Sequence, residues 1–285
     1  MNDFLAALLL GIIEGLTEFL PISSTGHLLI AEYLLDRHYS ALFIIAIQAG
    51  AILAITLIYW KRLWGMLQAF VGKDAPAAYD PLGINASPAQ SRDYAYKLLA
   101  AFAVTALGGL LVKKLGWELP DTVHPIAWAL IIGAVWMVLA EQWAARSAER
   151  HGERTQISWT VAILVGAAQV LAGVFPGTSR SAATIFVALL AGTTSRAAAT
   201  EFAFVIGIPT MFAATGYELL SLYLHGDIGA ENWGALAVAC AASALTAFVA
   251  VKWLLHYIQN HRFTVFAVYR LVLGGLLLLW LPAAA

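Results

Sequence analysis

The chain has 285 residues, of which 61% are hydrophobic and 12% are charged. Soluble domains carry about 25% charged residues, so this composition excludes a water-soluble globular protein and indicates a polytopic membrane protein. The formal net charge of −1 gives no reason to expect nucleic-acid binding, and the single cysteine, Cys240, excludes an intrachain disulfide framework. The N-terminal residues M-N-D-F-L lack the basic segment of a cleaved signal peptide, so none is expected.

The first predicted element, Phe4–Leu35, is apolar but is interrupted near its middle by Pro21 and a polar cluster. Broken backbone at membrane depth is tolerated only where it is buried in protein or lines a cavity. The segment is therefore predicted to be re-entrant, with one helix entering, a turn at the proline and one helix leaving. Three stretches of about the length and apolarity of a bilayer span follow, with an extramembrane loop at Gly72–Asp93. These predicted spans are Ala41–Trp60, Leu98–Val112 and Pro125–Trp143.

The second half of the chain repeats this order. Trp159–Leu190 is interrupted at Pro176, and three further spans follow at Phe202–Leu222, Trp233–Val251 and Phe263–Leu281. Aligning the two prolines gives an offset of 176 − 21 = 155 residues, which also pairs Gly11 with Gly166 and Ser24 with Ser179.

Because each half has an odd number of spans, the second half enters the membrane from the opposite face. The predicted fold is an all-α polytopic membrane protein with an inverted-topology repeat. It has about six transmembrane helices and two re-entrant helix pairs that meet near the midplane. We expect a single integral-membrane domain, 1–285, with repeat halves at 1–145 and 155–285.

Lysine and arginine residues predict the orientation of the chain, since they are concentrated in cytoplasmic loops. The side reached by the first span collects eleven of them, and the other side three. The first side is therefore predicted to be cytoplasmic, both termini periplasmic, and the first re-entrant pair open to the periplasm. The eleven are Lys61, Arg62, Lys73, Arg92, Lys97, Arg146, Arg150, Arg154, Arg196, Lys252 and Arg262, and the three are Arg37, Lys113 and Lys114.

Two carboxylates, Glu14 and Glu18, share one helix face in the first broken segment because they are four residues apart. An ionisable group inside the membrane is costly and faces a cavity or a partner. Two convergent carboxylates suit a hard divalent cation or a proton-transfer pair. The alternatives are a structural pair that binds the turn, and a proton or ion relay in a transporter.

A cluster of hydroxyl groups and one imidazole follows Pro21. Ser23, Ser24 and Thr25 precede a predicted helix start, where free backbone N–H groups can hold an anion. One hydroxyl is enough to cap the helix, so the cluster exceeds what a cap needs. His27 is a candidate to activate a serine or to protonate a leaving oxygen, with a structural histidine as the alternative.

The second broken segment carries an arginine in place of the carboxylates. Gly177 allows close backbone approach after Pro176, and Arg180 offers a planar fork that matches phosphate oxygens. The alternative is a structural salt bridge from Arg180 to Glu14, Glu18 or Glu201. The predicted substrate-binding groups of this segment are Gly177, Thr178, Ser179, Arg180, Ser181 and Thr184, and further polar residues inside spans, with either supporting or structural roles, are Gln48, Glu201 and Arg270.

Carboxylates would repel an anion held by Arg180 unless a divalent cation or a protonated group stands between them. Together the two segments therefore predict metal-assisted phosphoryl transfer on a lipid phosphate that reaches the membrane interior. The rival class is a transporter or a lipid flippase, since inverted repeats with broken helices are its common architecture.

The motifs E-G-L-T-E-F-L-P-I-S-S-T-G-H at Glu14–His27 and P-G-T-S-R-S-A-A-T at Pro176–Thr184, with A-V-Y-R at Ala267–Arg270, closely resemble the bacterial undecaprenyl pyrophosphate phosphatases of the bacitracin-resistance type. The resemblance implies hydrolysis of the C55 polyprenyl diphosphate to the monophosphate and inorganic phosphate at the outer face of the inner membrane. That step recycles the lipid carrier of peptidoglycan synthesis and confers resistance to bacitracin, which binds the substrate rather than the protein. The resemblance also implies a divalent cation, Mg or Ca, and a homodimer.

The resulting hypothesis is a metal-dependent membrane diphosphatase. Glu14 and Glu18 bind the cation or position water, Ser24 is the nucleophile, and His27 is the general acid/base. Direct attack by a water molecule, oriented by Glu18 and His27, is the mechanistic alternative. The predicted catalytic residues are Glu18, Ser24, His27 and Arg180, and Ser23 and Thr25 join the substrate-binding set.

Overall fold

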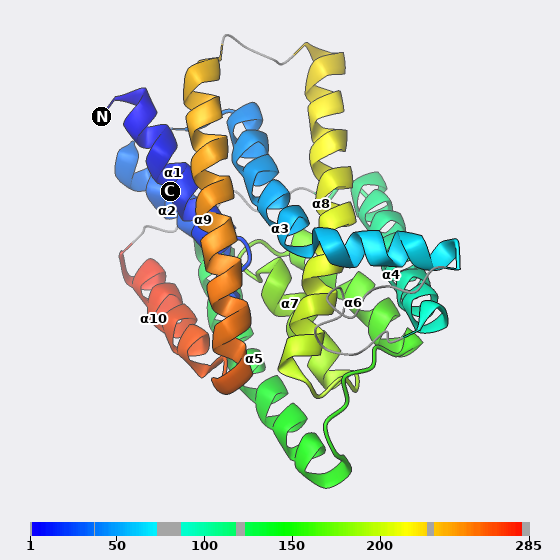
Figure 1. The fold of residues 1–285 in the computed structure, drawn as a ribbon. Helices are drawn as coiled ribbons and strands as arrows, with labels where there is room; N and C mark the ends of the chain where they lie inside the picture. Colours follow the sequence, from blue (N-terminus) through cyan, green and yellow to red (C-terminus); the bar gives the residue numbers. More distant parts are fainter. Residues whose placement is uncertain (1, 37, 73–86, 118–122, 227–230, 281–285) are drawn as a thin grey trace.

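A computed structural model of the chain describes residues 2–36, 38–72, 87–117, 123–226 and 231–280. These residues form ten α-helices and no strand, so the predicted all-α class is confirmed for the described part of the chain (Figure 1). In chain order they are α1 (Asp3–Thr17), α2 (Ser24–Leu35), α3 (Ala41–Phe70), α4 (Pro88–Lys114), α5 (Val123–His151), α6 (Trp159–Val174), α7 (Arg180–Leu190), α8 (Arg196–His225), α9 (Trp233–Asn260) and α10 (Thr264–Trp280).

Five of these helices, α3, α4, α5, α8 and α9, are long and apolar enough to cross a membrane. The sixth predicted span is α10, whose 17 residues extend about 26 Å at 1.5 Å per residue and lie at the short limit for a span. The chain is thus a multi-pass membrane protein. Leu281, the last residue of that predicted span, lies outside the described residues.

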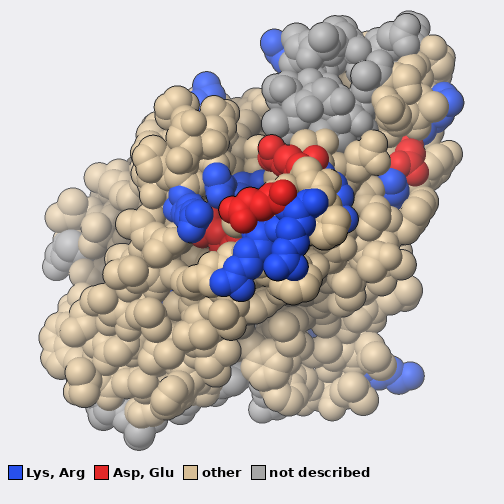
Figure 2. All heavy atoms as spheres, turned by 90° about the horizontal axis from the view of Figure 1, so that it is seen from below, with Lys and Arg blue, Asp and Glu red and all other residues tan. Residues whose placement is uncertain are grey.

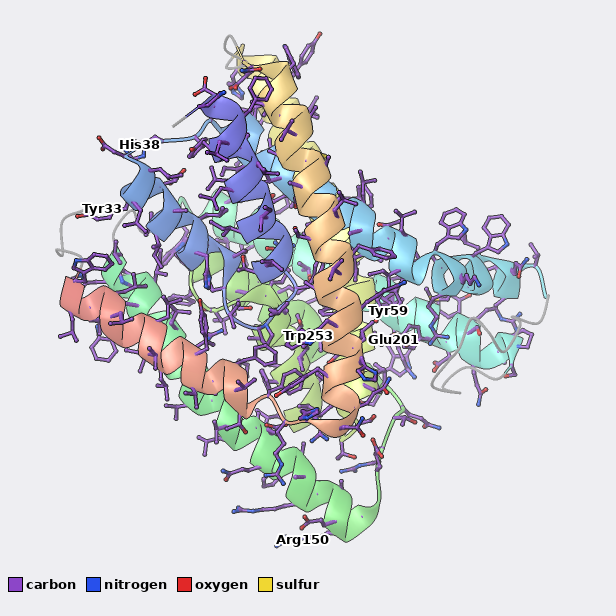
Figure 3. All side chains as sticks on the ribbon, turned by 60° about the vertical axis from the view of Figure 1, so that its left-hand side comes forward. Tyr33, His38, Tyr59, Arg150, Glu201 and Trp253 are labelled. Carbon is purple, nitrogen blue, oxygen red and sulfur yellow. The ribbon has the colours of Figure 1, made fainter. Side chains whose placement is uncertain are left out.

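Helix α3 continues ten residues beyond its predicted end at Trp60. In Figures 1 and 3 its later part runs sideways, away from the direction of the first part. Trp60 and Trp64 are exposed there and stack on one another, with ring centroids 6.0 Å apart. Tryptophan is enriched at membrane–water interfaces, so this arrangement fits a helix that leaves the bilayer and lies along its surface.

Residues 73–86 of the predicted loop Gly72–Asp93 lie outside the described residues, as do Arg37 and Lys73 of the charge comparison. The predicted end of the loop is wrong, because α4 begins at Pro88. Ser87 caps this helix in a capping box with Gln90, and Pro88 occupies the first helical position, where its missing N–H costs nothing. Asp93 and Lys97 therefore form an ion pair within the first turns of a helix.

Both broken segments consist of two helices joined by a turn that contains the proline, as predicted. The backbone repeats in detail at the second helix of each pair. Ser23 (φ 73°) and Ser179 (φ 69°) both adopt positive φ, and their side chains accept hydrogen bonds from the N–H groups of Gly26 and Ala182. The equivalent serines are 179 − 23 = 156 residues apart, so the alignment that paired Ser24 with Ser179 is wrong by one residue there. Ser24 instead corresponds to Arg180, and each is the first residue of its helix.

The first helix of each broken pair packs against a long helix of the other half, α1 against α9 and α6 against α4. Two glycines that the repeat alignment had paired make these contacts close. A Cβ atom at Gly11 would lie 2.3 Å from the carbonyl oxygen of Ala239, and one at Gly166 would lie 2.6 Å from that of Ala101. Any side chain at either glycine would push the two helices apart.

Charged side chains gather on one face, which Figure 2 views from below Figure 1. In Figure 3, Arg150 lies at the lower tip of α5, whereas Tyr33 and His38 lie near the opposite end of the molecule. Arg62, counted among the cytoplasmic cations, is not on the surface. It is 6% exposed and forms an ion pair with Glu201 at 3.0 Å.

Candidate active site

The two turns open onto one cavity of about 570 Å³. Its walls come from both broken segments and from the facing sides of α4, α6 and α8, which are packed together on the right of Figure 1. The sequence motifs, more than 150 residues apart, thus meet in space. The lining residues from the turns are Glu18, Ser23, Ser24 and Thr25 from the first, and Pro176, Gly177, Ser179 and Arg180 from the second.

A carboxylate joins the two turns. Ser24 Oγ donates a hydrogen bond of 2.6 Å to Glu18 Oε2, and Arg180 Nη2 lies 3.4 Å from Glu18 Oε1. The Glu18 side chain is 6% exposed, whereas that of Arg180 is 34% exposed and reaches into the cavity. Of the carboxylates considered for Arg180, the structure selects Glu18. The hydroxyl proton of Ser24 is thereby already directed at a base.

Two helix N-termini face the same cavity. Ser24 is the first residue of α2 and Arg180 the first residue of α7, and both line the cavity wall. The first amides of a helix have no partner within the helix, and the helix dipole adds partial positive charge there. A phosphate group placed between these two ends would meet backbone donors from both turns.

His27 is held away from the Ser24 hydroxyl. Its Nδ1 lies 2.6 Å from the carbonyl oxygen of Ser23, and its Nε2 lies 2.6 Å from Tyr269 Oη on α10. A carbonyl oxygen only accepts, so Nδ1 carries a proton, and the hydroxyl of Tyr269 is the hydrogen-bond partner of Nε2. His27 is not among the residues that line the cavity, and in this structure it fixes the strained backbone just before Ser24.

The predicted substrate-binding residues divide into two groups. Ser23, Thr25, Gly177 and Ser179 line the cavity with Arg180. Gly177 has φ +91°, and a Cβ atom there would lie 2.6 Å from the carbonyl oxygen of Ile126. Glycine is therefore required for the turn to approach α5.

Thr178, Ser181 and Thr184 are not among the lining residues. Ser181 Oγ donates to the carbonyl oxygen of Leu20 at 3.1 Å and so links α7 to the first turn. Thr184 is 1% exposed, and its hydroxyl donates to carbonyl oxygens within α7. In this structure these side chains support the site from behind rather than facing a ligand.

Comparison with known proteins gives the same answer as the motifs. The family model of the bacitracin resistance protein BacA matches residues 7–276. The chain belongs to this family. It is 58% identical over 285 residues to the undecaprenyl-diphosphatase of Xanthomonas axonopodis pv. citri, with both chains covered completely. It is 60% identical over 276 residues to that of Rhizobium etli, covering 97% of this chain and 96% of the relative. The resemblance inferred from the motifs is confirmed.

Arg270, whose role the sequence left open, ties the two turns together. It is fully buried, and its guanidinium donates hydrogen bonds of 3.0–3.3 Å to five backbone carbonyl oxygens. The arginine thus satisfies all of its donors without a carboxylate partner. Its acceptors are Pro21 in the first turn, Gly177 and Thr178 in the second, and Ala129 and Leu130 in α5.

A polar network on the cavity wall was missed by sequence reasoning. Gln169 Nε2 donates to Thr105 Oγ1 at 3.0 Å, and Thr210 Oγ1 donates to Gln169 Oε1 at 2.9 Å. These three residues come from α6, α4 and α8 and all line the cavity. The only available signal was a glutamine in an otherwise apolar helix. Gln48 and Glu201 are not cavity-lining residues, and Glu201 pairs with Arg62 near Tyr59 (Figure 3).

Glu14 lies one helical turn before Glu18 and is 1% exposed. Neither of its carboxylate oxygens has a hydrogen-bond partner, and it is not among the cavity-lining residues. Within the described ranges, no three or more His, Cys, Asp or Glu residues gather as a metal-binding group. Two carboxylates alone do not complete a coordination shell, so a cation held by Glu14 and Glu18 would need further ligands from substrate or water.

Proposed function

We propose that this chain hydrolyses undecaprenyl diphosphate to undecaprenyl phosphate and inorganic phosphate, which recycles the lipid carrier of peptidoglycan synthesis. The observation that supports the proposal is the Ser24–Glu18–Arg180 arrangement, in which a hydroxyl, a carboxylate and a guanidinium contact one another at one cavity. Membership of the bacitracin resistance family and the names of the relatives support it. They do not favour a transporter or a polyprenyl-phosphate flippase.

Ser24 is placed to attack the terminal phosphorus. Glu18 accepts the hydroxyl proton, the serine oxygen bonds to phosphorus, and the bond from phosphorus to the bridging oxygen breaks. The electron pair stays on that oxygen, which leaves as part of the lipid monophosphate. Water then hydrolyses the phosphoserine, and Arg180 with the N-terminal amides of α2 and α7 stabilises the charge that develops on the transferred group. In the alternative, a water molecule attacks phosphorus directly and gives its proton to Glu18.

A divalent cation, Mg or Ca, is part of the proposal. The unpartnered carboxylate of Glu14 and the adjacent Glu18 are the residues that would hold it. Mg²⁺ commonly binds through one or two carboxylates together with substrate phosphates and water, which fits a site with two carboxylates and no larger acidic cluster among the described residues. The cation would neutralise phosphate charge and reduce its repulsion by Glu18.

We further propose that the cavity opens to the periplasm of the inner membrane and that both termini are periplasmic. The charged face in Figure 2 would be the cytoplasmic side, because lysine and arginine are concentrated on that side of membrane proteins. Matching packing of α1 on α9 and α6 on α4 supports the inverted repeat with re-entrant pairs near the midplane.

The polyprenyl chain would lie along the apolar walls of the cavity, which include Phe102, Leu110 and Val170. The homodimer and the action of bacitracin on the substrate stay predictions from the resemblance.

The direct test is phosphate release by the purified protein in detergent. With undecaprenyl diphosphate as substrate we expect inorganic phosphate in a one-to-one ratio with the lipid monophosphate. Chelation of divalent cations should abolish the release, and added Mg²⁺ or Ca²⁺ should restore it. Ion-gradient-coupled uptake into proteoliposomes without phosphate release would instead support the transporter.

Replacing Ser24 by Ala separates the two mechanisms. If the serine is the nucleophile, kcat should fall by about a thousandfold, and acid quenching of the wild-type reaction with terminally labelled substrate should trap phosphate on Ser24. Near-normal turnover in Ser24→Ala, with no labelled protein in the wild type, would establish direct attack by water. Thr56→Ala is the matched control and should leave turnover unchanged, because its hydroxyl donates to the carbonyl oxygen of Ile52 within α3 and does not line the cavity.

A further inference from the structure

The charged side chains that line the cavity carry a net positive charge. The lining residues include three charged side chains, Glu18, Arg180 and Lys113. Glu18 and Arg180 pair with each other, whereas the polar contact made by Lys113 is to the neutral side chain of Tyr217. The wall therefore retains a positive charge that no lining carboxylate neutralises. An anion in the cavity would be attracted to it.

Lys113 lies close to the turn that presents Arg180. It is the next-to-last residue of α4, and Trp117, just beyond the helix, reaches the C-terminal end of α6. The indole Nε1 of Trp117 donates to the carbonyl oxygen of Val174 at 3.3 Å, and its ring contacts Phe175 edge to face. The end of α4 is thus held against the start of the second turn, so both cations face one space.

Tyr217 on α8 holds the lysine in place. Lys113 Nζ donates to Tyr217 Oη and lies 4.3 Å from the centre of the tyrosine ring, a cation–π contact. Tyr217 also lines the cavity. Lys114 is equally close to the negative end of the α4 dipole, and both lysines are exposed, but of the two only Lys113 lines the cavity. Dipole compensation alone therefore does not explain why Lys113 is fixed over the cavity.

We propose that Lys113, positioned by Tyr217, is a second phosphate-binding residue that selects diphosphates over monophosphates. This inference rests on the proposed function. The phosphate that is cleaved binds at Ser24 and Arg180, and the phosphate that stays on the lipid binds Lys113. When the bond to the bridging oxygen breaks, the new charge forms on that second phosphate, facing the lysine. A monophosphate occupies only one of the two positions, so it contacts either Arg180 or Lys113 but not both.

The kinetic test compares Lys113→Met with Lys114→Met in the purified protein. Lys113→Met should raise KM for a prenyl diphosphate about tenfold with a smaller change in kcat, and Lys114→Met should behave as wild type. The preference for farnesyl diphosphate over farnesyl phosphate, measured as the ratio of kcat/KM values, should fall about tenfold in Lys113→Met. Lys113→Arg should retain most of the preference. Equal behaviour of the Lys113→Met and Lys114→Met variants would overturn the inference.

A binding measurement separates this inference from the proposed function. Intrinsic tryptophan fluorescence or calorimetry can compare inorganic diphosphate with inorganic phosphate as ligands. Wild type should bind diphosphate about tenfold more tightly than phosphate, and Lys113→Met should lose this difference. If the preference for diphosphate depends on Lys113 but the protein does not hydrolyse the lipid, the proposed function is wrong and the inference stands. If the protein hydrolyses the lipid but Lys113→Met keeps the wild-type difference in affinity between diphosphate and phosphate, the inference is wrong and the proposed function stands.

Discussion

Replacing Glu18 by Gln is expected to lower kcat/KM for undecaprenyl diphosphate by about a thousandfold. The carboxylate accepts the hydroxyl proton of Ser24 at 2.6 Å and pairs with Arg180 at 3.4 Å. The amide keeps the size of the side chain but is not basic, and removal of a general base costs about 10²–10⁴ in rate. The loss should appear in kcat, measured as phosphate release under saturating substrate, because the proton is transferred during the chemical step.

Two comparisons make the Glu18 result specific. Glu32→Gln on α2 removes a carboxylate that accepts a hydrogen bond from the N–H of Tyr39, outside the cavity, and should leave turnover unchanged. His27→Gln tests the rival base. If His27→Gln abolishes turnover while Glu18→Gln keeps more than about a tenth of it, the base is the histidine. The side chains must then rearrange from the positions seen here, in which His27 binds Ser23 and Tyr269.

The sequence predicted the fold class and the convergence of the two motifs because both depend on local patterns. Apolar stretches broken by Pro21 and Pro176 are visible without a structure, and only a cavity or a protein interior tolerates such breaks in a membrane. The cost of burying Glu18 and Arg180 likewise pointed to a shared site. These inferences needed residue types and spacings, not distances.

The side-chain contacts could not be predicted, because they depend on rotations and helix offsets that the pattern does not contain. A one-residue shift in the turn makes Ser24, rather than Thr25, the counterpart of Arg180. His27 follows Ser24 by three residues, yet its ring binds α10 instead of the serine. The roles of the Gln169 network and of Lys113 were missed because their residues belong to separate helices. They line one cavity only when α4, α6 and α8 are packed together.

Replacing Arg270 by Met is expected to destabilise the protein more than any change in the cavity. The substitution removes the Arg270 donors from five carbonyl oxygens: those of Ala129 and Leu130 keep their helical partners within α5, whereas those of Pro21, Gly177 and Thr178 lie in the two turns. Each unsatisfied buried group costs about 1–3 kcal/mol, so even with relaxation the loss should reach about 4 kcal/mol. We expect little folded protein in detergent, and Arg270→Lys, with three donors at most, should fold with a clearly lowered Tm. Normal yield and Tm for Arg270→Met would refute the bracing role.

A pair of glycine substitutions tests the same brace without removing its charge. A Cβ atom at Gly133 on α5 would lie 2.2 Å from Arg270 Nη2, so Gly133→Ala must displace the guanidinium from its carbonyl acceptors. Gly275→Ala on α10 is the matched control, because nothing lies within 4 Å of its Cβ position. Alanine is favoured over glycine in a helix by about 1 kcal/mol, so the control should be neutral or stabilising while Gly133→Ala lowers both Tm and kcat. Since both turns rest on this one side chain, equal Tm values for the two variants would show that the turns are held by α7 and α5 packing without it.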